Sequence, residues 1–215
     1  TPGGPLKRGF DHFYGNIRGC GSQFAPLGLQ RDGTNAEHEW RDNKDFYYTH
    51  AMTENAVSYI EQTPDEIPLF LLVTYTAPHW PMHALPEDIE KYKGAYAEGW
   101  DVLRAQRLER MKELGLVPEG TPLPPRDGTG IAWVDALNKE WQQRRMEVYA
   151  AMIDSVDQGV GQLVQQLKEA GRFENTLFVV LSDNGASPED YGPNKTGRFL
   201  NAQTRDGRPM RVGSL

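Results

Sequence analysis

Two short apolar runs alternate with long amphipathic stretches along this chain. Residues 69–75 (LFLLVTY) and 176–181 (TLFVVL) are continuous and rich in large or β-branched apolar side chains. Runs of this length, flanked by helical patterns, are typical of strands buried on both faces of a sheet. We refer to them as the first and the second apolar run, and we predict that both are strands.

Four other segments are predicted to be helices. They cover residues 45–62, 87–91, 100–114 and 138–170. Pro64 lies just beyond the first of these segments, and Pro86 opens the second, where proline suits the first turn of a helix. The third is strongly charged, and its arginines are expected to form a solvated face.

The longest predicted helix, 138–170, carries the clearest apolar stripe. A break near Arg145 is considered, Gly159 and Gly161 would allow close packing, and Gly171 suits the end of the helix. The stripe repeats every 3.6 residues through Tyr149, Met152, Ile153, Val156, Val160, Leu163, Val164 and Leu167. A strand, a long helical crossover and a second strand indicate an α/β fold, in which helices sandwich a mostly parallel sheet.

The ends of the chain do not resemble those of a complete domain. Residue 1 is threonine, and residues 186–215 are rich in Gly, Pro, Asn and Arg without any periodic apolar pattern. Irregular segments of that length are uncommon inside a compact domain. We therefore expect residues 1–215 to form part of a single catalytic domain that is truncated at both ends.

Charge and composition exclude several classes of function. The net charge is −7, and no basic block with interleaved aromatic residues is present, which argues against nucleic-acid binding. No apolar run approaches the length of a membrane span. Cys20 is the only cysteine, so the chain has no intrachain disulfide. None of this decides the cellular compartment.

The candidate chemistry lies where the two predicted strands end. The second run leads into Ser182, Asp183, Asn184 and Gly185, and His79 follows the first run between two prolines. Ligands of α/β sheets gather at the carboxyl ends of strands, and carboxylate and amide oxygens suit Ca²⁺ or Mg²⁺. The same residues are also common in ordinary turns. His79 is open to two interpretations, an anion-binding or proton-donating group and a packing histidine.

Two further residues favour a structural interpretation. His12 lies in an aromatic stretch bracketed by glycines, where a structural role is weighed against metal binding. Cys20 stands between two glycines, and no feature of the sequence lowers the pKa of its thiol to make it reactive.

The ordered set of motifs resembles the type I sulfatase (arylsulfatase) family of the alkaline phosphatase superfamily. The resemblance covers nearly the whole chain, and residues 94–101 with Gly115 and Leu116 are similar to its bacterial arylsulfatase branch. The motifs are RGFDHFYG (8–15), APHWP (77–81), YAAMIDSVDQGVG (149–161) and NTLFVVLSDNGA (175–186).

This resemblance implies a calcium-dependent sulfate ester hydrolase with the alkaline phosphatase-like fold, present here incompletely. Asp183 and Asn184 match two calcium ligands of the family. His79 matches a histidine that contacts the sulfate ester and is a candidate proton donor to the leaving group. The family's nucleophile is a formylglycine made from cysteine in a Cys-x-Pro/Ala-x-Arg motif. Cys20, followed by Gly-Ser-Gln-Phe, does not match, so the nucleophile is expected outside this sequence.

Two alternatives are considered beside a sulfatase. One is a phosphoesterase or phosphonate hydrolase of the same superfamily, and the other is a degenerate, sugar-binding relative without catalytic activity. Two-zinc phosphatases more often carry Asp-His where this chain has Asp183-Asn184, and an amide oxygen suits calcium better than zinc. The expected partner is a small-molecule or saccharide sulfate ester, and the isolated 215-residue chain is expected to be inactive.

Overall fold

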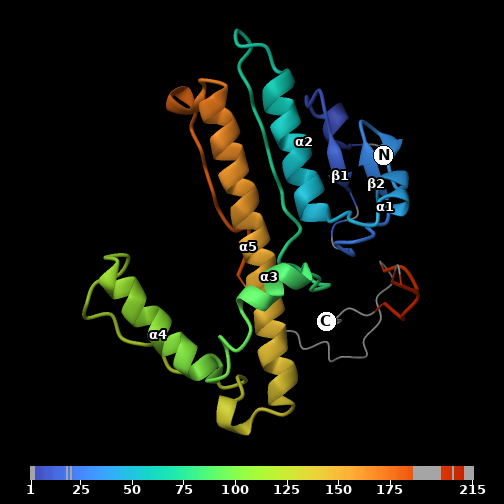
Figure 1. Ribbon diagram of the computed structural model, residues 1–215. Coiled ribbons are helices and arrows are strands. Elements are labelled where there is room, and N and C mark those ends of the chain that lie inside the picture. Colours follow the sequence, from blue (N-terminus) through green and yellow to red (C-terminus); the bar gives the residue numbers. More distant parts are fainter. Residues whose placement is uncertain (1–2, 18, 20, 186–199, 205, 211–215) are drawn as a thin grey trace.

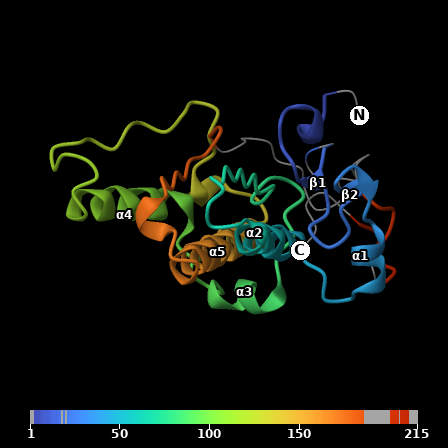
Figure 2. The same ribbon diagram turned by 90° about the horizontal axis from the view of Figure 1, so that it is seen from above.

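Two long helices that run side by side in the same direction form the centre of the molecule (Figure 1). They are α2 (Tyr48–Gln62) and α5 (Lys139–Glu169). Seen along these helices, a small sheet lies beside α2, and α4 (Gly99–Glu113) extends away on the opposite side (Figure 2). The structure is a computed structural model that describes residues 3–17, 19, 21–185, 200–204 and 206–210.

Helix α2 confirms the helix predicted from residues 45–62. It begins at Tyr48 and ends at Gln62, two residues before Pro64. A proline disfavours helical backbone at the residue before it, which explains why the helix stops at this point. The buried face of α2 carries Tyr48, Thr49, Ala51, Met52, Thr53, Ala56 and Ile60.

Helix α5 is a single helix of 31 residues, without the break considered near Arg145. The expected stripe is buried only in part: Met152, Leu163 and Leu167 are at most 5% exposed, whereas Tyr149 and Ile153 are each 42% exposed. The helix ends at Glu169, and Gly171 follows with φ +67°. Glycine adopts this left-handed conformation without steric cost, so Gly171 ends the helix as predicted.

Gly159 of α5 lies at a close contact with α2. A Cβ atom on this residue would lie 2.5 Å from Thr53 Oγ1 and 2.7 Å from Tyr75 Oη, and these two hydroxyl groups are hydrogen-bonded at 2.8 Å. Gly161, by contrast, has open space around the position of a Cβ. Close packing therefore depends on Gly159 and not on Gly161.

The small sheet is an antiparallel meander of three short strands. They are β1 (Tyr14–Asn16), β2 (Leu29–Arg31) and β3 (Thr34–Asn35). Asp32 and Gly33 form the two-residue turn between β2 and β3, both with positive φ. An Asp-Gly pair is a favoured sequence for such a hairpin. The sheet packs on α2 through a cluster of buried side chains: Leu29, Ala36, Phe46, Tyr48, Ala51 and Met52.

Helix α3 (Pro86–Lys91) is held against α5 by a buried carboxylate. Asp88 is 4% exposed and accepts hydrogen bonds from Ser155 Oγ at 2.8 Å and from Lys91 Nζ at 2.7 Å. Lys91 also pairs with Asp154 at 2.8 Å. Burial alone would raise the pKa of Asp88, but hydrogen bonds from Lys91, Ser155 and Gln158 outweigh it and lower that pKa.

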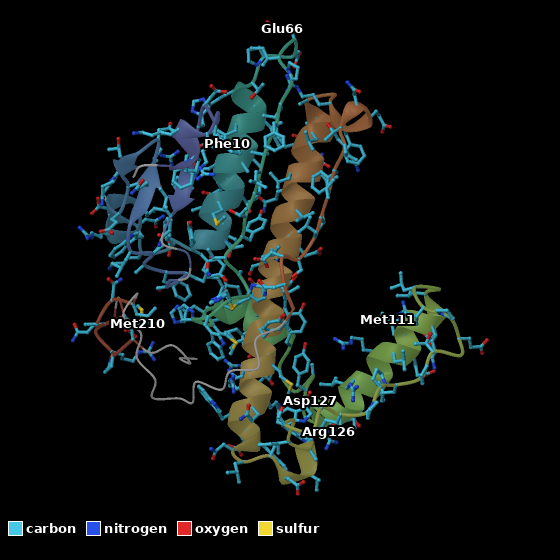
Figure 3. All side chains as sticks on the ribbon, turned by 180° about the vertical axis from the view of Figure 1, so that it is seen from behind. Phe10, Glu66, Met111, Arg126, Asp127 and Met210 are labelled. Atoms are coloured by element: carbon cyan, nitrogen blue, oxygen red, sulfur yellow. The ribbon has the colours of Figure 1, made fainter. Side chains whose placement is uncertain are left out.

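Helix α4 and the segment after it form an arm that projects from the helical centre (Figures 1 and 3). Met111 lies toward the far end of α4, while Arg126 and Asp127 lie near its base. Arg126 pairs with Asp101 at 2.9 Å, which ties the returning segment to the first turn of α4. The remaining helices are short: α1 (His38–Asp42) and the 3₁₀ helices at Pro5–Lys7, Trp133–Asp135 and Phe173–Asn175.

Both apolar runs are extended in the structure, but the prediction that they form strands of one sheet is wrong for the part of the chain that the structure describes. The first run keeps the alternation of a strand: Leu69, Leu71 and Val73 pack against the α2–α5 layer, whereas Phe70 and Leu72 are 78% and 60% exposed. In the second run, Leu177, Val179, Val180 and Leu181 are between 65% and 91% exposed.

The physical reason is the lack of a partner backbone. A strand is defined by ladder hydrogen bonds to a neighbour, and within the described ranges neither run belongs to a ladder. Figure 1 shows both runs descending in the same direction from the upper ends of α2 and α5. Parallel strands joined by helical crossovers have this arrangement, but within the described residues the two runs are not hydrogen-bonded in a ladder.

No helix in the described part of the chain is both long enough and apolar enough to cross a membrane.

Candidate functional site

His79 is exposed at the tip of a loop whose flanks are buried. The loop follows the first apolar run, and Ala77, Met82 and Ala84 on either side of His79 pack in one cluster with residues of α5. The backbone N–H of His79 donates to Thr76 O at 2.9 Å, which closes a tight turn. An accessible imidazole on a fixed loop is suited to contact a ligand.

The hydrogen bond of the His79 ring identifies its protonated nitrogen. Nδ1 lies 2.8 Å from the carbonyl oxygen of Trp80. A carbonyl oxygen can only accept, so Nδ1 carries the hydrogen and Nε2 is the nitrogen that gains or loses a proton. His79 can therefore accept or deliver a proton through Nε2 while its ring stays oriented by the backbone.

Asp183 and Asn184 are also exposed, directly after the second apolar run. Asn184 Nδ2 donates to Gly185 O at 2.8 Å, and Ser182 Oγ donates to Asn184 O at 2.7 Å. The amide nitrogen of Asn184 is thus engaged with the backbone, which leaves its Oδ1 as the group suited to a metal. A carboxylate and an amide oxygen match the donor preference of calcium.

These two residues alone would not complete a calcium site. Calcium takes six to eight oxygen ligands. Within the described residues, no group of three or more His, Cys, Asp or Glu side chains is placed to hold a metal ion. Asp183 and Asn184 therefore fit calcium by their chemistry but need further ligands.

The two candidate segments follow runs that point in the same direction (Figure 1). Each segment begins where its run ends, as the sequence predicts for ligands at the carboxyl ends of strands. The structure does not test whether His79 and Asp183 open onto one crevice, and this stays a prediction.

Two other histidines have structural surroundings. His83 is buried, its Nδ1 lies 3.3 Å from Ser22 Oγ, and its carbonyl accepts a hydrogen bond from Tyr47 at 3.0 Å. Burial raises the pKa of Tyr47 to about 12, so this tyrosine stays a hydrogen-bond donor at neutral pH. His12 lies 3.5 Å from Asp32 and stacks on Tyr59, which favours the structural interpretation of His12. Cys20 lies outside the described residues.

Trp80 and Arg145 form a contact next to His79 that the sequence does not indicate. The Arg145 Cζ atom lies 5.0 Å from the centroid of the Trp80 ring. These residues are separated by much of the chain, and neither belongs to a spacing pattern that would link them. Only the folded structure places them together.

Comparisons with known proteins point to one family. A profile of the Sulfatase family matches residues 2–209. The chain is 39% identical over 198 residues to an arylsulfatase from Klebsiella aerogenes, covering 86% of this chain and 41% of that protein. It is 36% identical over 197 residues to the uncharacterized sulfatase PB10D8.02c of Schizosaccharomyces pombe, covering 85% of this chain and 36% of that protein.

A solved structure is also similar in part. It is described as the crystal structure of Ps i-CgsB in complex with k-i-k-neocarrahexaose, with a TM-score of 0.49 and 22% sequence identity over 80% of this chain and 32% of that one. The chain thus spans about two fifths or less of the length of each of these three proteins.

Proposed function

The chain belongs to the sulfatase family, and from that premise we propose that the protein carrying it hydrolyses sulfate esters in the manner of an arylsulfatase. Membership in this family assigns the chain to the α/β fold of the alkaline phosphatase superfamily. The observation that carries the proposal is the family match over residues 2–209, which includes both His79 and the Asp183–Asn184 pair.

Asp183 and Asn184 are proposed as two of the ligands of a calcium ion. When bound, such an ion would supply positive charge opposite the sulfate group and favour the deprotonated nucleophile. Asp183 would contribute a negative charge toward the ion, and Asn184 a neutral oxygen from an amide whose nitrogen is held by Gly185 O. The hydrogen bond fixes the orientation of the Asn184 amide before the ion arrives.

His79 is proposed to contact the sulfate ester and to protonate the leaving alcohol. As the S–O bond breaks, the departing oxygen gains negative charge, which a proton from Nε2 of the imidazolium form of His79 would neutralise, leaving the neutral ring protonated on Nδ1. The bond from Nδ1 to Trp80 O holds the ring so that Nε2 is the donor. No residue of this chain is assigned as the nucleophile, which is proposed to be a formylglycine elsewhere in the protein.

The metal assignment is tested in the full-length protein. Calcium affinity would be measured by calorimetry for Asp183→Ala, Asn184→Ala and His79→Ala, together with turnover of 4-nitrophenyl sulfate. We expect Asp183→Ala to weaken calcium binding more than Asn184→Ala, because the first removes a charge and the second a neutral oxygen. His79→Ala should leave calcium affinity nearly unchanged.

Other outcomes would change the assignment. Equal loss of calcium affinity in all three variants would show that the roles are wrongly distributed. Preferred turnover of 4-nitrophenyl phosphate over the sulfate would favour a phosphoesterase, and no turnover of either would favour a non-catalytic relative. The isolated 215-residue chain should be inactive, because loss of a nucleophile typically costs several orders of magnitude in rate.

A further inference from the structure

Trp80, the residue after His79, is held from two directions. Its half-buried indole ring packs against an apolar cluster built by the His79 loop, α3 and α5. The guanidinium of Arg145 lies over the same ring at 5.0 Å from the centroid. The cluster consists of Ala77, Met82, Ala84, Ile89, Val148, Ala151 and Met152.

Arg145 is itself fixed on the helix. It lies in the second turn of α5, and its Nη1 donates to Gln142 Oε1 at 3.0 Å. A guanidinium over an aromatic face is attracted by the ring quadrupole, and the attraction grows as water is excluded from the pair. Arg145 is part-buried, so the contact with Trp80 is better shielded than one on an open surface.

The backbone carbonyl of Trp80 links the anchored indole ring to the imidazole of His79. The Trp80 carbonyl accepts the hydrogen bond from His79 Nδ1 at 2.8 Å. The ring of Trp80 is therefore anchored by α5, while the carbonyl of the same residue orients the imidazole.

We propose that Arg145 and Trp80 act as positioning residues that keep the hydrogen of the neutral His79 ring on Nδ1, so that Nε2 is the nitrogen that gives up a proton when the imidazolium form acts as an acid. The catalytic part of this inference rests on the proposed function of His79. The structural part does not, because it concerns only the hydrogen on Nδ1. A side chain on α5 thus controls which nitrogen of His79 exchanges a proton.

The first test reads the tautomer directly in the full-length protein. Nitrogen NMR of ¹⁵N-histidine-labelled protein at about pH 9, where histidine rings are ordinarily neutral, distinguishes Nδ1–H from Nε2–H, and His79→Gln assigns the signal. We expect Nδ1–H in the wild type, a shift toward Nε2–H in Arg145→Gln and a larger shift in Trp80→Ala. Arg145→Lys and Trp80→Phe keep a cation and an aromatic ring, and should restore much of the Nδ1–H signal.

Arg144→Gln is the matched control. Arg144 is the preceding residue on α5, and its guanidinium pairs with Glu147 at 3.0 Å. This variant removes a positive charge from the same turn but leaves the contact between Arg145 and Trp80 in place. It should therefore leave the His79 tautomer unchanged. Circular dichroism and thermal unfolding would establish that each compared variant is folded.

The second test measures turnover. With poorly acidic leaving alcohols, Arg145→Gln should lower kcat by about threefold to tenfold, less than the loss of a general acid itself, with little change in KM. An Nε2–H tautomer in the wild type, or one that neither Arg145→Gln nor Trp80→Ala alters, would overturn the inference. Absence of sulfatase activity would overturn the proposed function but leave the tautomer result standing.

Discussion

At the scale of single residues, the proposed role of His79 as an acid predicts that the effect of losing it depends on the leaving alcohol. His79→Ala should lower turnover most for sulfate esters of poorly acidic alcohols, by about 10²- to 10⁴-fold, because these most need a proton donor. For 4-nitrophenyl sulfate the loss should be smaller. Turnover measured across a series of aryl and alkyl sulfates would show this dependence. A defect of equal size for every ester would contradict the role of His79 as an acid.

A second residue-scale prediction concerns the buried carboxylate of Asp88. Its pKa is lowered in the folded protein, so its contribution to stability is present above the ordinary aspartate pKa and is lost as the pH falls through the folded value. Asp88→Asn should therefore reduce the free energy of unfolding by about 1–3 kcal/mol at pH 7. The difference from the wild type should shrink below about pH 4.

Urea unfolding of both proteins between pH 3 and pH 7 would measure this difference. Asp154→Asn is the control, because Asp154 shares Lys91 with Asp88 but is more exposed. Its effect should be smaller, as expected for an ion pair near the surface. Equal effects of the two substitutions would mean that the burial of Asp88 does not matter.

The sequence identifies some of these residues and not others. Asp183, Asn184 and His79 can be singled out because each follows an apolar run, and the ends of such runs are where ligands bind. The Trp80–Arg145 contact has no comparable signal, since the spacing of residues within a helix does not reveal what another segment brings to it. The Asp-Gly turn at 32–33 does carry a hairpin signal, which the helix and strand predictions did not use.

At the scale of elements, Gly159 allows α5 to pack closely against α2 at one point. Gly159→Ala should lower the free energy of unfolding by about 1–3 kcal/mol, because the new methyl group would displace the hydrogen-bonded hydroxyls of Thr53 and Tyr75. This cost should exceed the gain in helix propensity, about 1 kcal/mol. Thermal or urea unfolding would measure the change.

Gly161→Ala is its control two residues along the same helix. No atom lies within 4 Å of the position of the new Cβ, so only the gain in helix propensity remains. This variant should be as stable as the wild type or more stable, by up to about 1 kcal/mol. A stabilising effect of both substitutions would show that α2 and α5 are less closely packed at Gly159 than the structure indicates.

Helices could be predicted from this sequence more completely than strands. The bounds of α2, α3, α4 and α5 lie within a few residues of those expected, because a helix satisfies its backbone hydrogen bonds within its own segment. A strand depends on a neighbour that is distant in the sequence. The first and second apolar runs have the composition of strands, but a run becomes a strand only when a partner backbone pairs with it.

At the scale of the whole molecule, the exposed apolar runs have a consequence for its behaviour in solution. Extended backbone with unpaired polar groups, flanked by apolar side chains, is a template on which other chains can add as strands. We expect the isolated 215-residue chain to self-associate with rising concentration, and light scattering and thioflavin T fluorescence would follow the process. Val180→Lys should slow it, because a charge in the middle of the second run opposes strand pairing.

Leu116→Lys provides the comparison. Leu116 is 67% exposed, close to the 71% of Val180, but it lies on the α4 arm outside both runs. If Leu116→Lys slowed association as much as Val180→Lys, general hydrophobicity would explain the effect. A chain that stayed monomeric at every concentration would show that the runs are covered in solution. If the chain associates and only Val180→Lys slows the process, two segments of fewer than ten residues each govern its solubility. Charged residues placed in these segments should then raise the concentration at which the chain stays monomeric.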